Sequence, residues 1–303
     1  MPIRDAKFGR RRLLYSTLAL GAAYGLGLGS RDILRYIRRL PYERATAAVL
    51  REGGVATGLI LDDAIARLVA GGAVVPGKMA AAYQRRGGLP DWVVSALKGQ
   101  ASGEIKLNQA SVPYLLNLLW PLGIANQTAF NGRNPIPEGS LPRLASTGGW
   151  NLGLKKNGAN YYNRVEAVPL TAEQDAMVER MAATIYRPCC DNSALFPDCN
   201  HGAAMLGFLE LAAAQGQPEE RIWKLAKVLN GFWYPKQYVA MALLFDLRDN
   251  LDWEQVSPQT VLGKSFSSSS GWRANVDAQL SAVTQPGAVP TKAVRDGGSS
   301  CSI

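Results

Sequence analysis

Three of the four cysteines in this chain and its only histidine lie within thirteen consecutive positions, in the stretch CCDNSALFPDCNHG that begins at Cys189. Thiolate and imidazole groups are the ligands that zinc, copper(I) and iron–sulfur clusters use in proteins. The sequence therefore predicts a centre that holds a metal ion or an iron–sulfur cluster, with copper, zinc and iron–sulfur as the candidates. Its predicted ligands are Cys189, Cys190, Cys199 and His201.

The position of this segment in the chain supports the prediction. An apolar helix is expected from His201 to Gln215, with Asp198 or Asn200 as its N-cap. The N-terminus of a helix favours a thiolate at Cys199 and disfavours a charged imidazole at His201. Both side chains would then be in the form that binds a metal.

The stretch that starts at Cys190 also resembles the motif of CDGSH-type iron–sulfur proteins, through Cys190, Ser193, Pro197 and Cys199. Two spacings differ from that motif. Cys189 directly precedes Cys190, where the motif has one intervening residue, and His201 follows Cys199 by two positions instead of four. The resemblance implies cysteine and histidine ligands, and it extends to ligand type alone, because that family's domain is small and largely β.

A disulfide is the alternative use of these cysteines, because four cysteines in an exported chain permit three pairings. Cys190 with Cys199 would close a short loop, whereas Cys189 would reach Cys301 only if the C-terminal tail folded back. Met205 lies four residues after His201 and suits copper(I), although packing in the helix core is its simpler role. The choice between metal ligands and disulfides stays open at this point.

Other chemistry has little support in the sequence. With one histidine, a Ser–His–Asp triad has a single possible base, and Cys199 lies too close to His201 in sequence for the usual Cys–His arrangement. The chain has no P-loop, and its Gly-Leu-Gly at Gly25 lies in an apolar run rather than at a strand-to-helix turn. The reaction, if there is one, is not assigned.

The N-terminus combines a basic stretch with an apolar run, Leu13 to Gly29. It resembles a bacterial twin-arginine signal through Arg10 and Arg11, with Leu13 and Leu14 as the apolar pair, although Gly9 and Tyr15 depart from the usual residues. That resemblance implies export of an already folded protein to an oxidising compartment. No A-x-A cleavage pattern follows, so residues 1–30 are expected to stay as a signal or membrane anchor.

The charge distribution agrees with a membrane location. Residues 1–52 carry eleven basic and four acidic side chains, so +7 of the net charge of +9 lies there and +2 is left for the other 251 residues. Positive charge beside an apolar run indicates contact with anionic lipid headgroups, whereas a nucleic-acid protein needs a basic face on its folded domain. Small residues at every fourth position, Thr17 to Gly29, favour packing in a membrane protein complex.

The body reads as mostly α, with no persistent strand-like alternation and no internal repeat. After the anchor (1–30) we expect an N-terminal helical region (31–122), an irregular loop region (123–168), a C-terminal helical region that holds the Cys/His segment (169–283) and a disordered tail (284–303). Expected helices include 32–40, ended by Pro41, then 61–70, 77–85 and 90–98. Thr171 and Gln174 form a capping box before another.

Two functions fit these features. The first is a membrane-anchored protein at the extracytoplasmic face of a bacterial membrane that binds a metal or cluster, for electron transfer or metal handling. The alternative is a non-catalytic, disulfide-stabilised helical subunit of a membrane protein complex. The two differ in whether the cysteines are ligands or disulfides.

Overall fold

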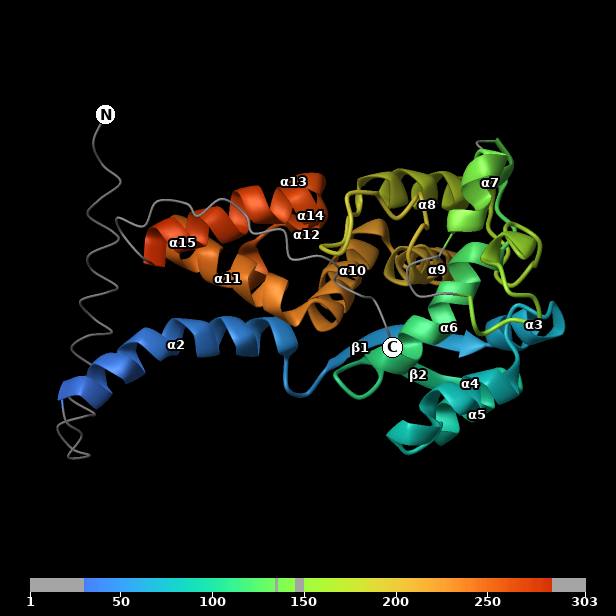
Figure 1. Cartoon of the computed structure of the whole chain (residues 1–303), viewed down its shortest axis with the longest axis horizontal. Coiled ribbons are helices and arrows are strands. Elements are labelled where there is room, and N and C mark those ends of the chain that lie inside the picture. Colours follow the sequence, from blue (N-terminus) through green and yellow to red (C-terminus); the bar gives the residue numbers. More distant parts are fainter. Residues whose placement is uncertain (1–29, 134–135, 145–149, 285–303) are drawn as a thin grey trace.

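The computed structural model describes residues 30–133, 136–144 and 150–284 (Figure 1). Apart from Ser30 and Thr284, the predicted anchor and tail, which includes Cys301, lie outside these residues. Within them the protein is mostly helical, as predicted, with one small sheet. None of the described helices has the length and apolar character needed to cross a membrane.

The N-terminal part contains a long helix, the two strands and short helices. Its elements are α2 (Ser30–Leu50), β1 (Val55–Asp62), α3 (Ala64–Ala70), α4 (Pro76–Tyr83), η1 (Gln84–Arg86), α5 (Asp91–Leu97), β2 (Ala101–Leu107) and α6 (Val112–Ala125). In the middle are α7 (Ala129–Arg133), η2 (Glu138–Arg143) and η4 (Gly158–Asn160).

The C-terminal part is a series of helices. It comprises α8 (Ala172–Thr184), α9 (Asn200–Ala214), α10 (Glu219–Trp233), α11 (Pro235–Asp249), η5 (Trp253–Gln255), α12 (Pro258–Leu262), α13 (Lys264–Ser267), α14 (Ser269–Trp272), the π-helical turn η6 (Arg273–Asp277) and α15 (Ala278–Thr284). In Figure 1, α11 lies alongside both α2 and α15, and α9 packs on both α6 and α8.

The sequence shows no persistent strand-like alternation, but the structure contains one pair of strands. β1 and β2 form an antiparallel pair in which Val55 lies opposite Leu107, and the expected helix 61–70 is the end of β1 followed by α3. Side chains along β1 alternate between buried and exposed, but the buried set includes a threonine. Thr57 can be buried because its Oγ1 donates a hydrogen bond to the carbonyl of Ile105. A polar residue therefore stands on the buried face of β1, and the alternation of apolar and polar residues that marks a strand is not visible in the sequence.

The expected end of the first helix at Pro41 was also wrong, because α2 continues through this proline to Leu50. A proline inside a helix costs about 3 kcal/mol, since it removes one backbone hydrogen bond. Tertiary contacts hold the C-terminal half of α2 nonetheless: Ala45 and Val49 are buried, and Arg44 pairs with Asp246 of α11.

The centre of the core is the crossing of α6 and α9, two helices that are buried on almost every side. Their backbones touch at a glycine from each helix. A Cβ at Gly123 would collide with the carbonyl of Ala203, and one at Gly207 would collide with the carbonyl of Leu119. This close approach fixes α9, whose N-terminus carries the cysteine segment.

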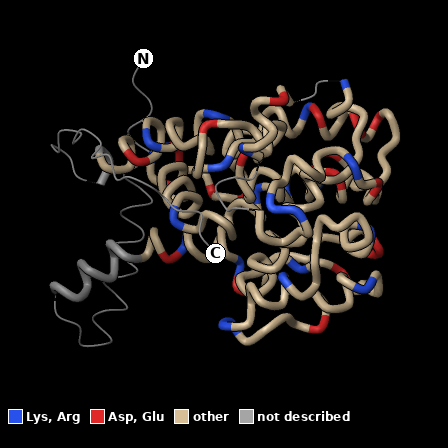
Figure 2. The backbone as a smooth tube through the Cα atoms, turned by 45° about the vertical axis from the view of Figure 1, so that its right-hand side comes forward, with Lys and Arg blue, Asp and Glu red and all other residues tan. Residues whose placement is uncertain are grey.

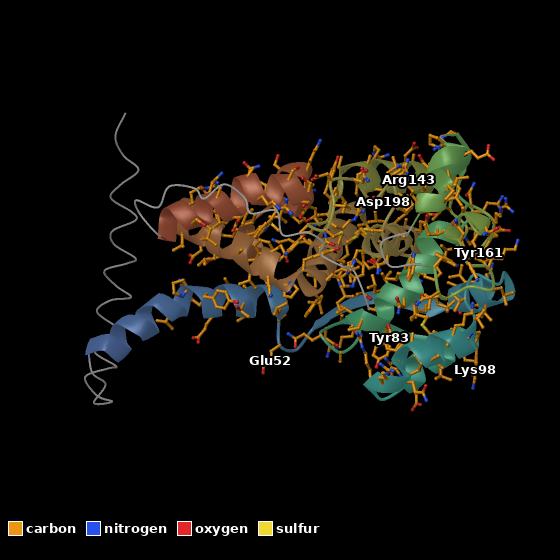
Figure 3. The ribbon with its side chains drawn as sticks, viewed as in Figure 1. Glu52, Tyr83, Lys98, Arg143, Tyr161 and Asp198 are labelled. Carbon is orange, nitrogen blue, oxygen red and sulfur yellow. The ribbon has the colours of Figure 1, made fainter. Side chains whose placement is uncertain are left out.

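The predicted irregular region 123–168 is mostly irregular, but α6 extends into it as far as Ala125 and short helical turns interrupt it. Its aromatic residues pack inward: Trp150 stacks on Tyr161 and meets the ring of Trp120 edge-on. Tyr83, labelled with Tyr161 in Figure 3, donates a hydrogen bond to the carbonyl of Pro113 in α6. The division into regions at 122 and 168 stays a prediction.

Lys and Arg residues are interspersed with Asp and Glu along the described chain in Figure 2. This agrees with the near balance of charge after residue 52.

The predicted capping box is present, since the Thr171 hydroxyl accepts from the backbone N–H of Gln174 and the Gln174 side chain accepts from the backbone N–H of Thr171. Met205 is fully buried in the core, which agrees with its predicted packing role.

Candidate metal centre

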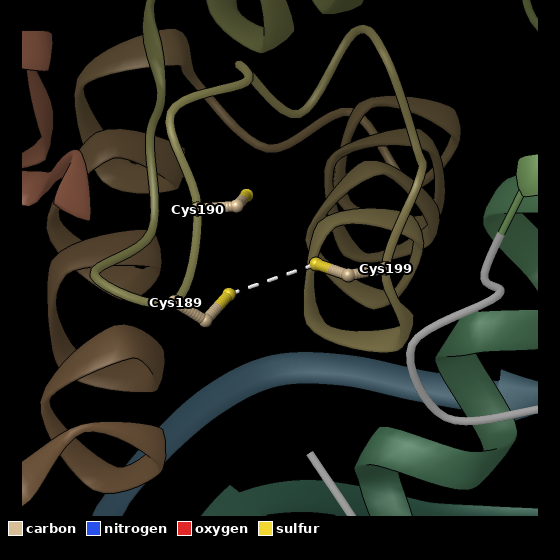
Figure 4. Close-up of side chains that lie close together, drawn as sticks. All are labelled: Cys189, Cys190 and Cys199. Atoms are coloured by element: carbon tan, nitrogen blue, oxygen red, sulfur yellow. Dashed lines mark hydrogen bonds between the residues drawn. The ribbon is translucent and has the colours of Figure 1, made fainter. Parts of the chain in front are cut away.

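The three cysteines of the segment come together at the N-terminal end of α9 (Figure 4). The Sγ atoms of Cys189, Cys190 and Cys199 all lie within 4.8 Å of one another, and those of Cys189 and Cys199 are 3.7 Å apart. A disulfide bond is about 2.05 Å long, so no such bond joins these sulfurs in the structure. We call this group the three-cysteine cluster.

Two features of the backbone bring the sulfurs of two adjacent cysteines to one point. The chain turns between Arg187 and Cys190, where the Cys190 N–H donates to the Arg187 carbonyl. The loop that follows is held by the start of α14, because the Cys190 carbonyl accepts from Ser269 and the Asp191 carboxylate accepts from Ser270. The turn and this anchorage direct both sulfurs toward Cys199.

Cys199 itself is the N-cap of α9, in place of the expected Asp198 or Asn200. Its Sγ accepts a hydrogen bond from the backbone N–H of Gly202 at 3.3 Å, and the side chain is 2% exposed. Its neighbour Asp198, labelled in Figure 3, lies in the loop just before the helix and accepts from the Asn192 amide. Burial raises the pKa of Asp198.

A fully buried arginine, absent from the predicted site, lies against the sulfurs. Nη2 of Arg187 is 3.2 Å from Sγ of both Cys190 and Cys199, and 3.4 Å from Oδ1 of Asp198. Its Nη1 donates to the carbonyl of Asn192 at 2.7 Å. Burial alone would lower the pKa of Arg187, but the sulfurs, Cys199 first, more than offset it, so the guanidinium stays charged.

The electrostatics favour the thiolate form at Cys199 over that at Cys190. Interactions with Cys189 and Cys190, and then the charge of Arg187, hold the pKa of Cys199 well below its usual range despite its burial. An interaction with Cys189 lowers the pKa of Cys190, but the interaction with Cys199 and burial outweigh it and raise this pKa to about 11. The favoured charge state therefore has a Cys199 thiolate beside the Arg187 guanidinium.

The sulfur of Cys189 is contacted by a residue between α10 and α11. Tyr234, between α10 and α11, donates its hydroxyl to Sγ of Cys189 at 3.0 Å. Burial first, and then the nearby sulfurs, raise the pKa of Tyr234 well above its usual range, so the phenol keeps its proton and acts as a donor. Its ring also lies 4.9 Å from that of His201.

His201 lies beside the cluster but is not among the residues whose ligand atoms fall within 4.8 Å of one another. Its ring packs between Trp233 and Tyr234, and its Nδ1 is buried without a hydrogen-bond partner. The prediction that His201 is a ligand is therefore not tested by these contacts.

Comparison with known proteins finds no family model that matches the chain, and no curated protein and no solved structure similar to it. The inference of function therefore depends on the site. Sequence reasoning missed two of its residues, Arg187 and Tyr234. The stretch RPCC places an arginine two residues before the cysteines, a signal that could have been noted, whereas nothing in the sequence connects Tyr234 with a segment 45 residues earlier.

Proposed function

We propose that the three-cysteine cluster binds a single soft metal ion, and that metal handling is the function of this protein. The observation that carries the proposal is the convergence of three sulfurs within 4.8 Å of one another around a buried positive charge. Thiolates are the ligands that soft ions prefer. A buried guanidinium also needs anionic partners, which ligating thiolates supply.

The spacing of the sulfurs favours one ion over a cluster. With metal–sulfur bonds of about 2.3 Å, sulfurs around one ion lie about 3.8–4.0 Å apart. The distance of 3.7 Å between Cys189 and Cys199 agrees with this spacing. An iron–sulfur cluster distributes its thiolates over several iron atoms and so spreads them farther apart.

Copper(I) suits the site better than zinc does. Three sulfurs form a complete set for a three-coordinate soft ion, whereas zinc in structural sites takes four ligands. Metal handling is favoured over electron transfer because copper centres that change oxidation state use imidazole ligands, and the chain has one histidine. A fourth ligand from His201 stays a prediction.

The experiment is a metal titration of reduced, metal-free protein. One equivalent of copper(I) should bind to the protein, with the ultraviolet absorption of a metal–thiolate bond, and Cys199→Ser should abolish stoichiometric binding. Cys301→Ser is the matched control, since it makes the same change at the cysteine outside the described residues. His201→Ala should retain binding if the three sulfurs are sufficient. Loss of binding in Cys301→Ser but not in Cys199→Ser would contradict this ligand set.

A disulfide is the second candidate, favoured by the 3.7 Å between Sγ of Cys189 and Cys199. Oxidation of this pair would give the disulfide-stabilised subunit of the alternative function, with a pairing different from the expected Cys190 with Cys199. Intact mass of protein purified without reductant separates the two functions. A loss of about two mass units together with absence of metal supports the disulfide, whereas bound metal and full mass support the metal site.

We also propose that the protein acts at the extracytoplasmic face of a bacterial membrane, held by residues 1–30, within a membrane protein complex. The support is the sequence: the Arg10–Arg12 run, the apolar stretch after it and the charge beside it. Fractionation of cells should recover the protein with membranes, and Arg10→Lys with Arg11→Lys should keep it inside. Wild-type protein in the soluble cytoplasmic fraction would contradict this location.

A further inference from the structure

Arg187 is a fixed positive charge in contact with the sulfurs of the cluster. Its side chain is 0% exposed, and Nη2 lies 3.2 Å from two of the three sulfurs. Solvent does not screen a charge at such a site, so it acts on any ion bound to those sulfurs.

The backbone around the guanidinium is shaped to admit it. A Cβ at residue 202 would collide with Nη2 and Cζ of Arg187, so the glycine in the first turn of α9 is what leaves room for the charge. The Asn192 carbonyl and the Asp198 carboxylate fix its orientation from the loop side. The loop and the first turn of α9 therefore hold one cation against the sulfurs.

We propose that Arg187 is a specificity-determining residue that shifts the site toward singly charged soft ions and against doubly charged ones. This inference rests on the proposed function. The guanidinium supplies the second positive charge that a divalent ion would bring to three thiolates. It repels a bound ion in proportion to that ion's charge, so a divalent ion loses more affinity than a monovalent one.

The expected effect is large enough to measure. Nη2 is 3.2 Å from each of two sulfurs, so an ion bonded to them at about 2.3 Å lies within about 5.5 Å of it. At this distance and an effective dielectric constant of about 20, each added unit of ion charge changes the affinity by more than tenfold.

Silver(I) and cadmium(II) are suitable probes, since both are soft, neither changes oxidation state here and they differ by one charge. The measured quantity is the ratio of cadmium to silver affinity, each obtained by competition with a chelator. Arg187→Gln should raise this ratio at least tenfold, and Arg187→Lys should leave it close to that of the wild type.

Arg180→Gln is the matched control, because it removes the same charge from an exposed position on α8 and should leave the ratio unchanged. Gly202→Ala provides a second route if Arg187→Gln does not fold, since it displaces the guanidinium and keeps every sulfur. It should raise the ratio in the same direction.

An unchanged ratio in folded Arg187→Gln, or in Gly202→Ala where the first variant does not fold, would overturn the role of Arg187. Wild-type protein that binds neither silver nor cadmium would instead overturn the proposed function. The two failures are therefore distinguishable.

Discussion

At the scale of single residues, the site is defined by how charge is buried. Arg187 is buried beside groups that compensate it, namely a low-pKa cysteine and a carboxylate. Glu210, in the middle of α9, is instead buried without a compensating charge beside it among the described residues. It is 0% exposed and neither carboxylate oxygen makes a well-formed hydrogen bond. Burial raises the pKa of Glu210 well above its usual range, although the Asn126 amide acts in the other direction.

Glu210→Gln should stabilise the protein increasingly as pH rises. Below pH about 4 the carboxyl is protonated in both the folded and the unfolded chain. Above that value the unfolded chain releases the proton and the folded chain keeps it, so stability falls by about 1.4 kcal/mol per pH unit until the folded pKa is reached. Urea unfolding of both proteins at pH 5 and pH 8 measures this difference.

The control for this prediction is Glu138→Gln, an exposed position in η2, where the free energy of unfolding should change equally at the two pH values. A Glu210→Gln advantage that is the same at pH 5 and pH 8 would show that Glu210 is not held protonated in the folded protein.

At the scale of elements, the contact between α6 and α9 positions the three-cysteine cluster. Gly123 and Gly207 let the two backbones touch, and α9 begins at the cysteine N-cap. The loop from Arg187 to Asp198 is held from a different side, by α14 and by Tyr234. The three sulfurs therefore converge only when α9 is packed on α6 and the loop is held by α14 and Tyr234.

Gly123→Ala should destabilise the protein by about 2–3 kcal/mol, because the new methyl group meets the Ala203 carbonyl at a fixed backbone contact. Gly77→Ala in α4 is the control, since a Cβ there meets nothing within 4 Å. It should be neutral or stabilising by up to about 1 kcal/mol. Thermal unfolding measures both, and equal losses of stability in the two variants would refute close packing at Gly123.

At the scale of the whole molecule, the site joins parts of the chain that are distant in sequence. It contains the three cysteines, Tyr234 after α10 and the serines of α14. Helix α9, which begins at the site, packs on α6 from the first half of the chain. Binding at such a site stabilises the folded chain, because the unfolded chain does not bring these groups together.

A bound ion should therefore raise the stability of the whole protein. At free copper(I) of about one hundred times its dissociation constant, the free energy of unfolding should rise by about 2.7 kcal/mol, and the melting temperature by several degrees. Cys199→Ser should melt at the same temperature with and without copper(I). A shift of equal size in that variant would place the binding elsewhere on the protein.

Much of the helical architecture was predictable because the relevant signals are local. The capping box at Thr171 and the apolar composition of the stretch after His201 are each properties of residues within a few positions of one another. β1 and the continuation of α2 past Pro41 were not predictable. Thr57 is buried through a hydrogen bond to a strand 48 residues away, and α2 is held by α11.

The sequence by itself determined which side chains can bind a metal and that they precede a helix, because cysteine spacing and helix propensity are properties of neighbouring residues. Only the tertiary structure decided that Cys189 and Cys190 both face Cys199, that Cys199 is the N-cap and that a buried guanidinium lies beside them. Those features depend on the turn between Arg187 and Cys190, on Gly202 and on the packing of α9 against α6. Burial and close approach arise from contacts between distant segments, and these contacts set the charge beside the three sulfurs.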